Sequence, residues 1–162
     1  MKLVILTSVV ALVLNLSVHA ESTISLTGVH NCCKKCDDGI IKAVKSVDGA
    51  SVTTDKGNVS ITAPNEASAK KAVSALLAAG YAGQGAEVPT VADAKVKSAT
   101  VSGVHLCCDK CVKALDKAVM GIGGVTKQNA TKGAKSFTVE GEFSTQALAT
   151  ALNKAGFNGS VN

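Results

Sequence analysis

The apolar residues of this chain recur with two spacings, one typical of strands and one typical of helices. Residues 24–29 alternate apolar and polar side chains, which predicts a strand. After Cys36 the apolar positions follow a helical spacing, and Asp48-Gly49 ends that pattern. Continued through the first half, the pattern predicts helix 33–46, strands 50–54 and 59–63, a helix from Pro64-Asn65 to Gly80, and strand 81–86.

The second half of the chain repeats this order of elements, so we predict an internal repeat. The pair Gly80-Tyr81 returns 76 residues later as Gly156-Phe157. The predicted elements are strand 96–104, a helix with Leu115, Ala118, Val119 and Ile122 on its buried side, a hairpin of strands 125–128 and 135–139, helix 143–154, and strand 157–161. We therefore expect an α+β fold of two βαββαβ domains, 22–86 and 96–162, joined by a linker over 87–95.

The first twenty residues have the pattern of a secretory signal peptide. A positive start at Met1-Lys2 precedes a mostly apolar run from Leu3 to Val18, and small residues follow up to Ala20. The run is shorter than the roughly 20 residues that a membrane-spanning helix needs, although an uncleaved anchor is the alternative. We expect segment 1–20 to be removed, the remaining chain to have no membrane span, and the protein to be periplasmic or secreted.

The kinds of basic and aromatic residues in the chain exclude one class of partner. The formal net charge is +5, and every basic residue is a lysine. Nucleic-acid sites depend on Arg side chains and on stacking with aromatic rings. Because the chain has no Arg and few aromatic residues, we exclude a nucleic-acid partner. The lysines are more simply explained as solvated helix faces.

One nonapeptide occurs twice and contains all six cysteines of the chain. Residues 28–36 read Gly-Val-His-Asn-Cys-Cys-Lys-Lys-Cys, and residues 103–111 read Gly-Val-His-Leu-Cys-Cys-Asp-Lys-Cys. Each copy gathers one His and three Cys, which is how a chain builds a small thiolate-rich metal site. The candidate ligands are His30, Cys32, Cys33 and Cys36 in the first copy, and His105, Cys107, Cys108 and Cys111 in the second.

The Cys-x-x-Cys spacing has a chemical meaning at the start of a helix. A helix N-terminus carries partial positive charge and free N–H groups, and both stabilise a thiolate over a thiol. Cys32 and Cys107 add a third sulfur to each pair, unless they are only small buried residues. His30 and His105 add an imidazole, unless they are solvated loop residues or orient a ligand without binding the metal.

With these motifs, both halves resemble the heavy-metal-associated (HMA) domain family, whose members include copper chaperones, N-terminal domains of metal-pumping ATPases and a periplasmic mercury-binding protein. The resemblance covers residues 22–86 and 96–161. The family motif is Gly-Met-x-Cys-x-x-Cys, and it matches Gly28, Cys33 and Cys36 in the first half and Gly103, Cys108 and Cys111 in the second.

This resemblance implies two tandem ferredoxin-like domains, each a four-stranded antiparallel sheet with two helices on one face and one metal site. It also places Tyr81 and Phe157 where the family often has a side chain near the metal, although both are more readily explained as core residues. The expected cargo is a soft metal ion, which the protein would capture, buffer or hand on. A metal-transporting membrane protein or another metal carrier is the expected partner.

The nonapeptide departs from the family motif in its length and its ligands. Val29 and Val104 replace the motif's Met, and the loop is two residues longer because it gains a His and a Cys. The family implies Cu(I), which we expect first, while the added ligands favour Zn(II) or a heavier thiophilic ion second.

Two other functions would use the same cysteines. A thiol–disulfide redox protein would use the Cys-x-x-Cys pairs, since an exported protein meets an oxidising compartment. A structural or interaction protein would use the clusters to staple or link chains. The sequence suggests no Ser/His/Asp set and no glycine loop before a Lys-Ser or Lys-Thr pair, so we expect no enzyme activity.

Overall fold

The structure is a computed structural model that describes residues 20–162. The predicted signal peptide, except for Ala20, lies outside the described residues. The first half contains β1 (Ser22–Leu26), α1 (Lys34–Lys45), β2 (Ser51–Asp55), β3 (Asn58–Ala63) and α2 (Glu66–Ala78). The second half contains β4 (Lys95–Ser102), α3 (Asp109–Met120), β5 (Val125–Gln128), β6 (Ser136–Ser144), α4 (Thr145–Lys154) and β7 (Ser160–Val161). No helix in this part of the chain combines the length and the hydropathy that a bilayer crossing requires.

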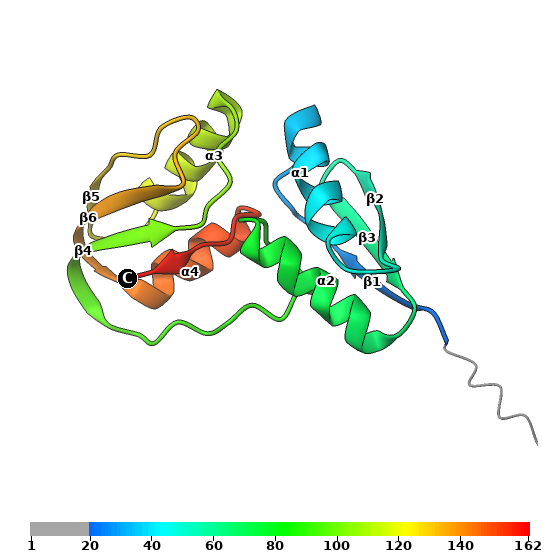
Figure 1. The fold of residues 1–162 in the computed structure, drawn as a ribbon. Helices are drawn as coiled ribbons and strands as arrows, with labels where there is room; N and C mark the ends of the chain where they lie inside the picture. The colour runs from blue at the N-terminus through cyan, green and yellow to red at the C-terminus, as the bar shows by residue number, and fades with distance from the viewer. Residues whose placement is uncertain (1–19) are drawn as a thin grey trace, which may run out of the picture.

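The first half forms an antiparallel sheet with strand order β1-β3-β2, and α1 and α2 pack against it (Figure 1). Ile61 on β3 lies opposite Ile24 on β1 and Val52 on β2. Because side chains alternate along a strand, this register keeps the apolar residues of the three strands on the face that the helices cover.

The second half forms an antiparallel sheet with strand order β5-β6-β4-β7. The pairing of β4 with β6 runs from Lys95↔Ser144 to Ser102↔Ser136, with one irregularity between Val96 and Ser98. The short strand β7 adds to the free edge of β4 through Val101↔Val161. Apart from β7, the strands take the same relative places as in the first sheet.

The helices that follow the two cysteine loops, α1 and α3, bury the same kind of stripe. A four-residue interval keeps side chains on one face of a helix, which here faces the core. The last cysteine of each nonapeptide begins its stripe, so packing further along the helix fixes its position. The buried stripes are Cys36, Ile40 and Val44 in α1, and Cys111, Leu115 and Val119 in α3.

Two predicted strands, one at the end of each half, differ from the structure. Residues 81–86 are not a strand, because Tyr81 and Gln84 make only isolated bridges, to Phe157 and Thr27. The first sheet therefore has three strands instead of the expected four. Strand 157–161 is reduced to β7, because the bridge to Tyr81 diverts its first residue toward the other half.

The predicted start of helix 143–154 is also wrong. Phe143 and Ser144 end β6, which is longer than the expected strand 135–139. The helix α4 begins at Thr145 because the Ser144 hydroxyl caps it, accepting a hydrogen bond from the Ala147 N–H.

The two halves are joined where the C-terminal ends of α2 and α4 meet between them (Figure 1). The Ala82 N–H donates to the Gly156 carbonyl at 3.1 Å, and the Asn158 N–H donates to the Gly80 carbonyl at 3.0 Å. The Asn158 side-chain amide also donates to the Leu77 carbonyl at 2.9 Å. The buried apolar residues of both halves form one continuous cluster. This docking sets the two cysteine loops against each other.

Candidate metal site

Both Cys-x-x-Cys pairs lie at the first turn of a helix, as the sequence predicts. Cys33 and Cys108 are the N-cap residues of α1 and α3 and have extended backbones. The Cys36 N–H donates to the Cys33 carbonyl at 2.8 Å, and the Cys111 N–H donates to the Cys108 carbonyl at 3.0 Å. Each Cys-x-x-Cys pair therefore places two cysteines at the N-terminus of its helix, which carries partial positive charge.

The docking of the halves brings the six cysteines into a single group of free thiols. The sequence predicts one set of thiols in each half and does not indicate that the two sets touch. Within the halves, the Sγ–Sγ distances are 3.8 Å for Cys32–Cys36 and Cys33–Cys36, 3.7 Å for Cys107–Cys111 and 3.5 Å for Cys108–Cys111. Between the halves, they are 3.4 Å for Cys32–Cys108, 3.5 Å for Cys36–Cys107, 3.7 Å for Cys32–Cys111 and Cys33–Cys107, and 3.9 Å for Cys36–Cys111.

The group has a buried side and a more open side. Cys36 and Cys111 are fully buried at its base, whereas the other four cysteines are partly exposed. An ion could therefore enter beside Cys33 and Cys108 and be held from below by the two buried sulfurs. Described ligand atoms that lie within 4.8 Å of one another fall into groups of three, and Cys33, Cys36 and Cys107 form one of them.

The six thiols differ in their affinity for protons. Burial raises the pKa of Cys108, but the Cys111 backbone and the Cys32 thiol more than offset it and lower that pKa to about 6. The Cys36 backbone N–H lowers the pKa of Cys33. Burial and contact with neighbouring sulfurs raise the pKa of Cys32 and of Cys107. The metal-free site therefore mixes thiolates with thiols, and metal binding must release protons.

The two histidines lie beside the sulfurs, each stacked on an aromatic ring of the other half. His30 stacks on Phe157 with ring centroids 4.4 Å apart, and His105 stacks on Tyr81 at 4.6 Å. Burial lowers the pKa of both imidazoles, which keeps them neutral at physiological pH. The Nε2 atoms of both are buried and have no hydrogen-bond partner among the described residues. His30 has a ring nitrogen within 4.8 Å of the Cys32 and Cys111 sulfurs, so it can serve as a ligand there.

Tyr81 ties the cysteine helix of its own half to the histidine of the other half. Its hydroxyl donates to the Cys36 carbonyl at 3.1 Å, and its ring is 1% exposed. Gly39 makes room for this contact, since a Cβ at that position would collide with the Tyr81 hydroxyl. Tyr81 and Phe157 are thus core residues, and each also stacks on a candidate ligand.

Sequence reasoning missed the residues that dock the halves. Gly80 and Gly156 both have positive φ, at 93° and 86°, where the sequence already predicts helix ends. A Cβ on Gly80 would lie 2.5 Å from the His105 nitrogen, and one on Gly156 would collide with the His30 nitrogen. Gly39 did carry a signal, because a glycine inside a helix costs about 1 kcal/mol relative to Ala and requires a packing reason.

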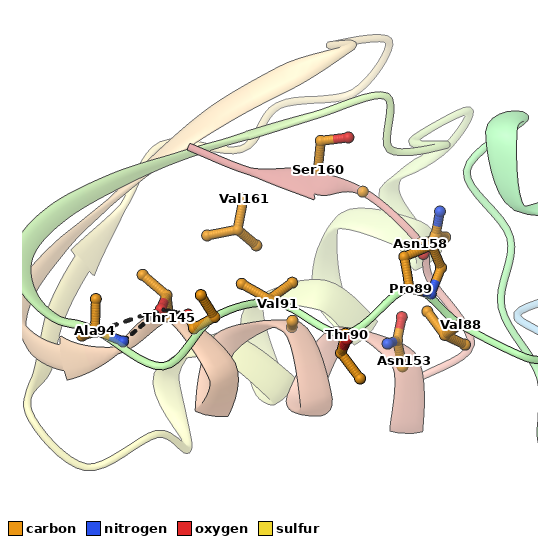
Figure 2. Close-up of a pocket in the computed structure, with 13 residues that line it drawn as sticks. Val88, Pro89, Thr90, Val91, Ala94, Thr145, Asn153, Asn158, Ser160 and Val161 are labelled. Atoms are coloured by element: carbon orange, nitrogen blue, oxygen red, sulfur yellow. Dashed lines mark hydrogen bonds between the residues drawn. The ribbon is translucent and has the colours of Figure 1, made fainter.

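The pocket drawn in Figure 2 lies elsewhere and has different chemistry. It has a volume of about 420 Å³ and is bounded by residues 88–92 and 94, by α4 and by the chain around β7. The Thr145 hydroxyl holds the linker there, donating to the Ala92 carbonyl at 2.7 Å and accepting from the Ala94 N–H at 3.0 Å. Among the described residues that line it there is no Cys, His or acidic side chain, so this pocket offers no ligands for a soft metal ion.

Comparisons with known proteins find similarity to solved structures, of which one is described below. No protein-family profile matches the chain, and no curated protein matches it. The solved structure is that of the N-terminal soluble domains of Bacillus subtilis CopA, which is 19% identical to this chain. The match covers 89% of this chain and 95% of that chain with a TM-score of 0.34. A likeness of this size carries no argument about function, which must come from the site itself.

Proposed function

We propose that this chain is an exported protein that binds soft metal ions, Cu(I) first, and captures, buffers or hands on those ions. The observation that carries the proposal is the group of six free thiols, in which every sulfur lies 3.4–3.9 Å from a sulfur of the other half. Thiolates select soft ions such as Cu(I) over hard ions such as Mg²⁺ or Ca²⁺. The role is binding and transfer of an ion, with no chemical conversion of a substrate.

The grouping of ligand atoms favours Cu(I) over Zn(II). Structural Zn(II) sites have four ligands in a tetrahedron. In the described part of the chain, the mutually close sets of ligand atoms have three members each, such as Cys107, Cys108 and Cys111. Three thiolates suit the trigonal coordination that Cu(I) accepts.

We infer that residues 22–86 and 96–162 are tandem ferredoxin-like domains of the HMA type, linked by 87–95 and exported by signal peptide 1–20. Two observations support the tandem part. Both halves have the element order strand–helix–strand–strand–helix, and the sheet orders β1-β3-β2 and β5-β6-β4 give equivalent strands equivalent places. Truncation at position 87, followed by circular dichroism, tests whether the first half folds alone.

Transfer of the ion would begin at the open side of the site. Cys33 and Cys108 are partly exposed, and the lowered pKa of each favours the thiolate that binds metal. A thiolate of the partner would add to the ion there and displace these two sulfurs, while Cys36 and Cys111 would be released last. The partner would be a metal-transporting membrane protein or another metal carrier.

A thiol–disulfide redox protein is the second candidate. A lowered pKa at Cys33 beside the buried Cys36 is the arrangement of a reactive dithiol, and Cys108 with Cys111 repeats it. In such a reaction each pair would lose two electrons and two protons to a disulfide of the partner, which would be reduced to two thiols.

Anaerobic metal binding distinguishes the two candidates. The reduced chain 21–162 is mixed with Cu(I), Zn(II) or neither in the presence of a chromophoric competitor, and bound ions and free thiols are counted. We expect tight Cu(I) binding that is lost when Cys33, Cys36, Cys108 and Cys111 are all replaced by Ser. The matched control is Met120→Leu, which removes the exposed soft sulfur outside the group and should change nothing. Failure to retain Cu(I), together with a reversible dithiol couple of oxidising potential, would reject metal binding in favour of the redox role.

A further inference from the structure

The six sulfurs are arranged as the corners of one octahedron. Nine pairs of sulfurs lie 3.4–3.9 Å apart. Three more pairs, Cys32–Cys33, Cys33–Cys108 and Cys107–Cys108, lie within 4.8 Å. These twelve distances are the twelve edges of an octahedron. The remaining pairs are its opposite corners, namely Cys32 with Cys107, Cys33 with Cys111, and Cys36 with Cys108.

Four alternate faces of this octahedron are triangles of mutually close sulfurs, and each sulfur belongs to two of them. A trigonal ion with metal–sulfur bonds of about 2.3 Å holds its three sulfurs about 4.0 Å apart, close to the nine short edges. The four faces are Cys33/Cys36/Cys107, Cys32/Cys33/Cys108, Cys107/Cys108/Cys111 and Cys32/Cys36/Cys111.

We propose that the two halves share one cluster of four Cu(I) ions, one on each of these faces, with every cysteine thiolate bridging two ions. This inference rests on the proposed function and replaces one ion in each half with a single polynuclear site between them. Six thiolates and four Cu(I) ions carry a net charge of −2. The N-termini of α1 and α3, with about half a positive charge each, both face the cluster and offset part of that charge.

His30 gives the fourth face a spare ligand. Its ring nitrogen lies within 4.8 Å of Cys32 and Cys111, which are two corners of that face, and its Nε2 has no other partner among the described residues. Because His30 is held by stacking on Phe157 of the other half, this ligand is available only when the halves are docked.

The cluster would also hold the halves together. A thiolate that bridges two ions is bonded through them to sulfurs of both loops, so the ions add to the few hydrogen bonds at residues 80–82 and 156–158. Binding of the first ion would strengthen the docking that forms the remaining faces, which predicts cooperative loading.

Stoichiometry and X-ray absorption of the reduced chain 21–162 test the proposal. Under anaerobic titration with Cu(I), native mass spectrometry should show mainly the empty chain and the chain with four ions. Absorption spectroscopy of the loaded protein should show trigonal sulfur coordination and a Cu–Cu scattering path. Saturation at two ions with linear coordination and no Cu–Cu path would overturn the cluster and leave the proposed function intact, whereas failure to retain Cu(I) would reject both.

The double substitution Cys32→Ser with Cys107→Ser separates a shared cluster from independent sites. These residues are opposite corners, so each of the four faces loses one thiolate while both Cys-x-x-Cys pairs remain. We expect the bound Cu(I) to fall from four ions to two or fewer and the Cu–Cu path to disappear. An unchanged ion count in this variant, verified as folded by circular dichroism, would overturn the proposal, and Met120→Leu serves as the control that keeps four ions.

Discussion

The two halves place equivalent cysteines in equivalent positions, but they anchor the loops around them differently. In the first half, Asp37 accepts hydrogen bonds from the Asn31 side-chain amide and from the Thr54 hydroxyl, the latter at 2.8 Å. In the second half, Leu106 takes the place of Asn31, is 2% exposed, and joins the hydrophobic core. The cysteine loop is thus held by polar hydrogen bonds in the first half and by apolar packing in the second, and the cysteines take equivalent positions in both.

A second difference lies under the stacked histidines. The first half pairs the Tyr81 hydroxyl with Gly39, which leaves space for it. At the equivalent positions the second half has Phe157, which has no hydroxyl, and Ala114, which needs no such space. The local packing therefore varies while the sulfur positions are kept. We infer that function depends on how the two halves are placed relative to each other and less on the packing within each half. Four predictions test this comparison of the halves.

The largest effect is expected from a methyl group at the junction of the halves. In Gly156→Ala the new Cβ meets the His30 nitrogen and, at 2.5 Å, the Gly28 carbonyl, so the halves should separate and Cu(I) binding should fall from four ions to two. Small-angle scattering and ion counting measure both changes. Gly133→Ala is the matched control, because Gly133 has the same positive φ but open space around its Cβ position. If the Gly133 variant lost the same number of ions, backbone strain rather than docking would be the cause.

The two loop anchors should differ in their contribution to stability. Leu106→Ala removes a buried side chain and should cost about 2–5 kcal/mol of unfolding free energy. Asn31→Ala removes one hydrogen bond to Asp37, and Asp37 still accepts the hydrogen bond from the Thr54 hydroxyl. This substitution should cost about 1 kcal/mol of unfolding free energy. Urea unfolding of the metal-free protein measures both, and equal losses would contradict the distinction between an apolar and a polar anchor.

A Gly→Ala substitution in α1 should lower the stability of the protein, whereas the same substitution inside a helix usually raises it. Gly→Ala inside a helix normally stabilises by about 1 kcal/mol, but Gly39→Ala should destabilise by roughly 1–2 kcal/mol because its Cβ collides with the Tyr81 hydroxyl. Adding Tyr81→Phe, which copies the pairing in the second half, should recover most of the loss. Thermal unfolding of the single and double variants measures the effect, and a stabilised Gly39→Ala would refute it.

The smallest effect concerns the reactivity of the metal-free thiols. With its pKa lowered to about 6, Cys108 is mostly thiolate at pH 7 and mostly thiol at pH 5, so its alkylation should be about tenfold slower at pH 5. Cys32 and Cys107, whose pKa values are raised, should react last. Brief treatment with iodoacetamide followed by peptide mass spectrometry gives the order, and early modification of Cys107 would contradict it.

Much of the local structure could be predicted from the sequence, because it depends on neighbours in the chain. The helical spacing after Cys36 and the Asp48-Gly49 stop predict a helix over 33–46, and α1 covers 34–45. The prediction of strand 81–86 was wrong because the local pattern of residues carries no information about a pairing partner in the other half. Tyr81 bridges to Phe157 of the other half instead of extending the sheet of its own half.

By itself, the sequence determined which atoms could bind a soft ion and that they lie at two helix N-termini, since both follow from residue type and short spacing. Only the tertiary structure decided that the two sets of thiols form one group. That meeting depends on close backbone approach at Gly80 and Gly156 and on the hydrogen bonds between residues 80–82 and 156–158. Such contacts join residues far apart in the chain and leave no periodic pattern in the sequence.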